Sequence, residues 1–202
     1  MKNSVVLATV IMAIVGTGSI VGTTDGFGIL TNPSSSTNVQ QTPFEGHVTI
    51  VAKHADGTVY AYRQSDNTVT IYGKTCASVL IFGTNSTQCG GNTSTDKFQY
   101  VAVGTSNNPE SDTSVYLGSE IVRAIKTQGG TTNATSGGHA FADVVSLITI
   151  GNATGGASLN EAGLFDAALA HQGHMFARKL ISPAIAVNNG DLVNVKWTIT
   201  IG

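Results

Sequence analysis

The sequence predicts a mainly β protein: an antiparallel β-sandwich of jelly-roll type, with one helix near residues 68–82 and a hydrophobic N-terminal helix ahead of it. From Val193 to Ile201 apolar residues alternate with Asn, Lys and Thr, the period of a strand with one buried face. Gly, Thr, Ser and Asn recur between short apolar runs, as turns between strands require. Only 11% of the 202 residues are charged, which indicates a surface wetted by hydroxyls and amides.

The first 23 residues predict a signal peptide or membrane anchor. Lys2 gives a positive start, and residues 5–21 are almost wholly apolar or small until Asp25 ends the run. A run of this length is long for a signal core and short for a spanning helix, which needs roughly 20 residues. We favour a cleaved export signal over a retained anchor or pilin-like assembly helix. Either alternative predicts an extracellular or cell-surface protein that meets the membrane only through this segment.

Residues 24–44 predict a polar spacer, and residues 45–202 the folded domain. The spacer is rich in Thr, Ser, Asn, Gln and Pro, and its few sizeable apolar residues include Phe27, Ile29 and Leu30. An extended segment of this kind can also add as a strand to a neighbouring subunit, so it is a candidate donor strand.

The two cysteines, Cys76 and Cys89, agree with export because disulfides persist in oxidising compartments. A bridge between them would close a short loop and contribute on the order of 3 kcal/mol. The alternative is two unpaired buried thiols. A metal pair is disfavoured, because the spacing is not Cys-x-x-Cys and no histidine lies nearby.

Along the domain, strands are predicted where apolar runs lie between turn residues. Ala55-Asp56-Gly57 predicts a hairpin turn, and Asn188-Asn189-Gly190-Asp191 predicts another between the last two strands. Polar loops or turns are predicted at 105–114, 129–138 and 151–158. The predicted strands are residues 47–53, 58–63, 98–104, 121–126, 140–150, 159–165, 183–187 and the final alternating segment.

The predicted helix rests on one apolar stripe at three- and four-residue spacing: Val69, Tyr72, Cys76, Val79 and Leu80. Asp66 or Asn67 is the expected N-cap, and Gly83 the expected end. Gly73 costs a helix about 1 kcal/mol relative to alanine, so tertiary packing must hold this one.

Four successive segments of the domain, taken in order, resemble a known type of domain. They read Ser-Asp-Asn-Thr-Val-Thr-Ile-Tyr-Gly-Lys-Thr-Cys-Ala-Ser-Val-Leu at 65–80, Tyr-Val-Ala-Val-Gly-Thr at 100–105, Leu-Gly-Ser-Glu-Ile-Val-Arg at 117–123, and Leu-Asn-Glu-Ala-Gly-Leu-Phe at 159–165 followed by Trp-Thr-Ile-Thr at 197–200. In this order the set resembles the β-sandwich domain of phage tail-fibre and other virion proteins, and of related secreted archaeal surface proteins. The resemblance implies a structural role and no catalytic residues. The export segment and the cysteine pair depart from the viral version and favour a cell-surface protein.

Charged residues are scarce, so Glu161 and Arg123 are the candidate functional groups. Glu161 as a general base or metal ligand would need a second carboxylate or histidine at a catalytic spacing, and none is recognisable. We therefore expect Glu161 to bond backbone amides or to pair with Arg123 or Arg178. The sequence predicts no enzyme and no cofactor.

His171 and His174 form the best metal candidate, with Asp166 as the nearest further ligand. Zinc would need two more ligands, so exposed loop histidines are the favoured interpretation and no metal site is predicted.

Four Asn-x-Ser/Thr sequons are candidate glycosylation sites, and all fall in predicted loops: Asn85, Asn92, Asn133 and Asn152. Chance acceptors are the alternative in a chain so rich in Asn, Ser and Thr.

The function predicted from the sequence is a secreted structural or adhesive cell-surface protein that self-associates, as a homo-oligomer or polymer, through sheet edges. A virion structural protein of tail-fibre type is an alternative. An extracellular glycan-binding module, using loops at 105–114 and 129–138, is another. The formal net charge of -2 and the lack of any Lys/Arg cluster exclude a nucleic-acid footprint.

Overall fold

The computed structural model describes residues 44–82, 97–127, 129–136 and 139–201. The predicted export segment and hydrophobic N-terminal helix, and most of the spacer, lie outside these residues. Within them, no helix is long and apolar enough to cross a membrane. The elements in chain order are β1 (Phe44–Lys53), β2 (Val59–Val69), α1 (Ile71–Phe82), β3 (Tyr100–Gly104), β4 (Glu120–Ile125), β5 (Thr131–Ser136), β6 (His139–Thr149), β7 (Ser158–Phe165), β8 (Met175–Ala186) and β9 (Leu192–Ile201).

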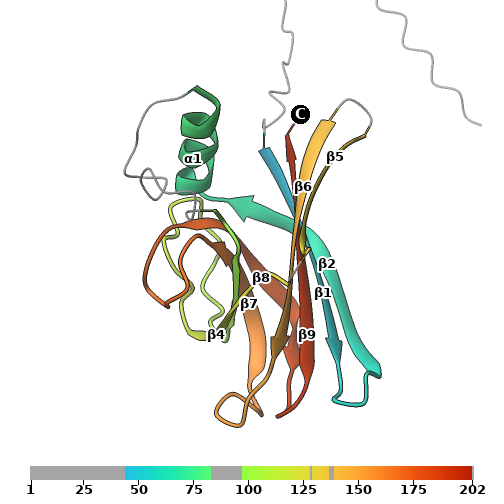
Figure 1. The fold of residues 1–202 in the computed structure, drawn as a ribbon. Coiled ribbons are helices and arrows are strands. Elements are labelled where there is room, and N and C mark those ends of the chain that lie inside the picture. The colour runs from blue at the N-terminus through green and yellow to red at the C-terminus, as the bar shows by residue number, and fades with distance from the viewer. Residues whose placement is uncertain (1–43, 83–96, 128, 137–138, 202) are drawn as a thin grey trace, which may run out of the picture. The chain divides into compact units, whose positions relative to one another are not determined.

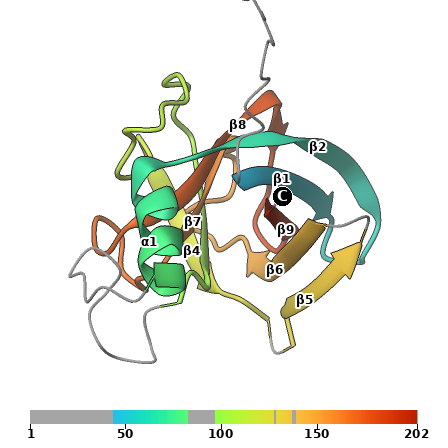
Figure 2. The ribbon, with the colours of Figure 1, turned by 90° about the horizontal axis from the view of Figure 1, so that it is seen from above.

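Nine strands form one antiparallel sheet in the order β4-β3-β7-β8-β2-β1-β9-β6-β5, curled as a half-barrel (Figure 1). The predicted mainly β, antiparallel class with one helix is therefore confirmed for the described residues. The two-layer sandwich is not confirmed, because all nine strands follow one hydrogen-bonded order. Figure 2, looking from above, shows the curl, with β2 passing from α1 to the far side of the sheet.

The sheet has two arms, and β2 belongs to both. Most of β2 pairs with β1, while only Thr68 and Val69 pair with β8, opposite Arg178 and Ala177. On the other side the arms approach again just after β4. There the Thr127 amide donates to the Val145 carbonyl at 2.9 Å. The arms are thus joined by a narrow seam at each side of the curl.

The core lies between the two arms. The predicted alternation in β9 is confirmed, since Val193, Val195, Trp197 and Ile199 are all buried. Trp197 lies opposite Val48 of β1 on one side and Val144 of β6 on the other. The core is completed from the other arm, where the buried residues include Val101, Val103, Leu159, Leu164 and Ile181.

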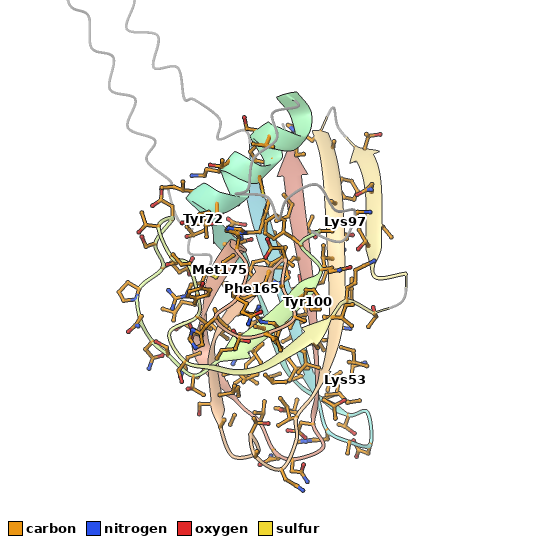
Figure 3. The ribbon with its side chains drawn as sticks, turned by 60° about the vertical axis from the view of Figure 1, so that its left-hand side comes forward. Lys53, Tyr72, Lys97, Tyr100, Phe165 and Met175 are labelled. Carbon is orange, nitrogen blue, oxygen red and sulfur yellow. The ribbon has the colours of Figure 1, made fainter. Side chains whose placement is uncertain are left out.

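A second, smaller apolar cluster lies apart from this core. Ala102, Leu117, Phe165 and Met175 are buried in it, with Tyr100 and Tyr116 packed at its margin. Figure 3 shows Met175, Phe165 and Tyr100 together below α1. Leu117 comes from the long connection between β3 and β4, so this connection covers part of the arm and is itself held in place.

The helix begins later than the sequence predicts. Asp66 and Asn67 do not cap it, because both still pair with β1, opposite His47 and Gly46. Thr70 is the N-cap: its hydroxyl accepts the Gly73 amide at 3.1 Å. β2 therefore continues to Val69, six residues beyond the predicted strand end at 63, and the helix starts at Ile71. The expected end at Gly83 lies outside the described residues.

Gly73 is buried where α1 meets β8, and a Cβ added to it would lie 2.5 Å from the Phe176 carbonyl oxygen. Helix propensity alone predicts that Gly73→Ala gains about 1 kcal/mol. We expect instead a loss of about 1–3 kcal/mol, because the backbone of β8 cannot yield as a side chain does. Ser78→Ala, at an exposed position of the same helix, is the matched control. Urea denaturation of both variants decides between the two effects, and a stabilised Gly73→Ala would contradict the close packing.

Two local predictions are wrong. Residues 131–136, expected within a turn region, form β5; its side chains are all exposed, so no apolar alternation marks it. Asn188–Asp191 makes the expected turn, with Gly190 at φ 85°, yet β8 and β9 are not neighbours. That turn carries the chain from one arm to the other and is not a hairpin.

Candidate functional site

Glu161 of β7 is fully buried, and its carboxylate is surrounded by donors from the β3–β4 connection. The backbone amides of Ser119, Gly118 and Ser106 donate to it at 2.8, 3.0 and 3.3 Å. Arg178 of β8 donates to the same carboxylate through Nη2 at 2.8 Å and Nε at 3.2 Å. The expectation that Glu161 bonds backbone amides and pairs with an arginine is confirmed, with Arg178 as the partner.

Arg178 also holds a second part of the β3–β4 connection in place. It donates to the carbonyl oxygens of Pro109 at 2.7 Å and Asn108 at 2.9 Å. Glu110, next in the chain, accepts the Leu180 amide, Lys179 and Thr68. Burial raises the pKa of Glu110, but the Leu180 amide, then Lys179 and Thr68, outweigh it, so its pKa lies below the ordinary value. The connection from 105 to 119 is thus held on the sheet by buried charge.

Arg123 of β4 belongs to a separate group. Its guanidinium donates to Glu120 through two nitrogens at 2.7 and 2.8 Å, and to the Ala167 carbonyl at 2.7 Å. It also lies 3.8 Å from the centroid of the Phe165 ring. These contacts all join Arg123 to other parts of the fold, and Arg123 does not pair with Glu161.

The residues of the metal candidate come together only in part. His174 Nδ1 lies 3.0 Å from Asp166 Oδ2, and the His174 amide donates to the same carboxylate at 2.6 Å. His171, at φ 57°, lies instead against the Tyr116 ring, with centroids 5.4 Å apart. Among the described residues no three His, Cys, Asp or Glu side chains are placed to hold a metal ion. The Asp166–His174 pair closes the β7–β8 loop.

A further titratable cluster, which sequence reasoning missed, joins the β1–β2 turn to the β8–β9 turn. Asp191 is buried and accepts the Tyr60 hydroxyl at 2.8 Å and the Asn188 amide at 2.8 Å. His54 Nδ1 lies 3.2 Å away, and its ring stacks on Tyr60 with centroids 4.3 Å apart. In the sequence, the one signal for this cluster was Asp191 in the predicted Asn-Asn-Gly-Asp turn.

The acid and the phenol of this cluster titrate outside their ordinary ranges. Burial raises the pKa of Asp191, but the Asn188 amide, Tyr60 and His54 outweigh it and leave the pKa lowered. Burial, together with the bond to Asp191, raises the pKa of Tyr60. Since all three side chains are bonded to one another or to backbone, the cluster ties two turns together.

Some of the predicted disulfide and glycosylation sites lie within the described residues and others lie outside them. Cys76 is buried in α1, while Cys89 lies outside the described residues, so the bridge stays a prediction. Asn85 and Asn92 also lie outside them. Asn133 and Asn152 are both exposed, but Asn133 lies on β5 and not in a loop, so of these two described sequons Asn152 alone has the predicted placement.

The sheet ends in two edges that differ. The β4 edge is approached by β6, where the Ser146 hydroxyl donates to the Ile125 carbonyl at 3.0 Å. Among the described strands, β5 pairs with β6 alone, in regular register, and its outer backbone edge faces away from the sheet. Beside β5 lies a largely apolar hollow of about 390 Å³, reached by Phe141 of β6 and by Ile199 and Ile201 of β9. This open edge with its hollow is the candidate interaction surface.

Comparison with known proteins gives no relative: no family model, no curated protein and no solved structure matches the chain.

Proposed function

We propose that this chain is an exported structural or adhesive protein that associates with copies of itself through the edge of its sheet. The open β5 edge carries the proposal. Unpaired strand edges present N–H and C=O groups that seek a partner, and proteins usually guard them with charge, proline or a bulge. β5 reads Thr-Thr-Asn-Ala-Thr-Ser and has none of these guards.

The buried charges support a structural role. Glu161, Arg178, Glu120 and Arg123 are engaged with one another or with backbone, so they hold loops and strands in place. The predicted export segment, the predicted Cys76–Cys89 bridge and the exposed Asn152 sequon suit an extracellular protein.

The resemblance to virion and archaeal surface β-sandwich domains belongs to the same proposal. Three of its pieces, at 100–105, 117–123 and 159–165, contribute to the neighbouring strands β3, β4 and β7. A sandwich of jelly-roll type is the finer architecture that we propose, since the two arms face each other across one core. A virion structural protein is the alternative source, distinguished by whether neighbouring genes encode viral tail parts.

The test is electron microscopy of native surface material, combined with mass spectrometry of the mature N-terminus. Filaments or a lattice built from a chain starting near Thr23 are expected. A strictly monomeric mature protein would contradict the self-association.

A glycan-binding module is a second candidate, favoured by one observation. Tyr72 lies 5.2 Å from His174 and Tyr116 lies 5.4 Å from His171, ring centroid to centroid, so both histidines of the β7–β8 loop are paired with a tyrosine ring. Sugars stack on such rings. A glycan array probed with the protein tests this candidate, and an array without binding would count against it.

A further inference from the structure

The open edge of β5 is suited to receive one more strand. All six side chains from Thr131 to Ser136 are exposed, and β5 carries no charge. Every ladder of the sheet is antiparallel. A strand that added here would therefore continue the sheet by main-chain hydrogen bonds, as in β-augmentation.

The hollow beside this edge favours apolar side chains on an added strand, because its own lining is largely apolar. Phe141, Ala142, Ile199 and Ile201 line it, and no residue that lines it is charged. Ile201 is 41% exposed although it ends a strand whose other inward residues are buried. The described part of the sheet therefore leaves apolar surface uncovered at this place.

The chain itself holds a segment with matching chemistry. Residues 26–44 carry no charge, and Gly26–Asn32 contains Phe27 and Ile29 two residues apart, with no proline inside it. Two apolar residues at this spacing project from one face of a strand. The chain enters the domain at Phe44, whose β-partner is Ile201, a residue of the hollow. Phe44, the first described residue, therefore lies beside the apolar surface of the hollow.

We propose that residues 26–32 of one copy pair as a strand with β5 of a second copy and place Phe27 and Ile29 in the hollow. This proposal rests on the self-association proposed above and names its partner and its site. Eleven residues, 33–43, separate this strand from β1. Fully extended they span at most about 40 Å, enough to bridge adjacent copies. Asn133 lies on the edge itself, so a glycan there would block the pairing, whereas one on Asn152 would not.

Two spacer variants of the full chain test the contribution of the segment. Ile29→Asp is expected to weaken association at least tenfold, measured by analytical ultracentrifugation over a range of concentrations. Val39→Asp places the same charge in the same spacer but outside residues 26–32, and is expected to associate like the parent. Both positions lie outside the described residues, so neither change removes a contact described for the domain.

Cross-linking identifies the partner. A chain with Ile29→Cys is mixed with a chain carrying Ala134→Cys and oxidised, and mixtures with Val39→Cys or Leu169→Cys serve as controls. A covalent dimer specific to the first mixture is expected. A cross-link formed only within a chain that carries both cysteines would overturn the second copy as partner. Polymers that persist in Ile29→Asp, without any cross-link, would overturn the strand while leaving self-association intact. A parent chain that stays monomeric would overturn both.

Discussion

Replacing Glu161 with alanine is expected to lower the free energy of unfolding by about 3–5 kcal/mol, as is typical when one partner of a buried ion pair is removed. Arg178 is only 2% exposed and would keep its charge without its carboxylate. The amides of Ser106, Gly118 and Ser119 would lose their acceptor at the same time. Urea denaturation of the purified variants measures the loss, with exposed Glu45→Ala as the matched control.

The double variant Glu161→Ala/Arg178→Ala should cost clearly less than the two single losses added together, since neither charge is then left alone. Hydrogen exchange adds a local readout: the amides of Gly118 and Ser119 should lose protection in Glu161→Ala before the core strands do. An unfolding free energy equal to that of Glu45→Ala, with unchanged exchange, would show that the ion pair does not anchor the β3–β4 connection.

Asp191→Ala is expected to cost about 2–4 kcal/mol, because the buried carboxylate accepts hydrogen bonds from Tyr60 and the Asn188 amide and lies against His54. Asp191→Asn keeps the shape and should cost less. Asp56→Ala is the control, since Asp56 is an exposed acid whose side chain accepts one nearby amide. Thermal unfolding at pH 7 ranks the three, and a loss for Asp191→Ala no larger than that for Asp56→Ala would contradict the tie between the two turns.

The pH dependence of stability follows from the direction of each pKa shift. The pKa of Asp191 is lowered on folding, so its contribution is present above the unfolded-state value of about 3.9 and is lost as the pH falls through the folded value. The pKa of Tyr60 is raised, so its contribution is present below about pH 10 and is lost at higher pH. The stability difference between the parent and Asp191→Asn should therefore narrow below about pH 4. A difference that stays constant from pH 7 to pH 2 would contradict this linkage.

The strands that bury one face were predictable, because burial leaves a period of two in the sequence. β9 shows this clearly, whereas β6 was predicted from a continuous apolar run and buries Ser146 while it exposes Leu147. β5 was not predictable, since an edge strand with all its side chains in solvent carries no such alternation. The helix start was misplaced because Asp66 and Asn67 are good capping residues, yet pairing with β1 holds them in the strand.

The sequence predicts which types of residue form the candidate site, but not which of these residues meet. Glu161 stands out in the sequence because charged residues are scarce. Backbone amides and an arginine were predicted as the types of partner it would have. The choice of Arg178 over Arg123 depends on the register of β7 against β8, in which Gly163, two residues from Glu161, faces Arg178. The Asp191 cluster joins residues 137 positions apart, a distance over which local patterns carry no information. The open edge could not be read from the sequence at all, because it depends on which strand comes last in the sheet.

Phe44 and Ile201 lie opposite each other, so the described domain is entered and left at the same end (Figure 1). The turns at 54–58, 151–157 and 188–191 are at the other end, about 30 Å away at roughly 3.4 Å per residue along β9. A copy held by its N-terminal side therefore points these turns outward. Asn152 is among them, so any sugar it carries would face the surroundings, and peptide tags inserted there would stand farthest from the point of attachment.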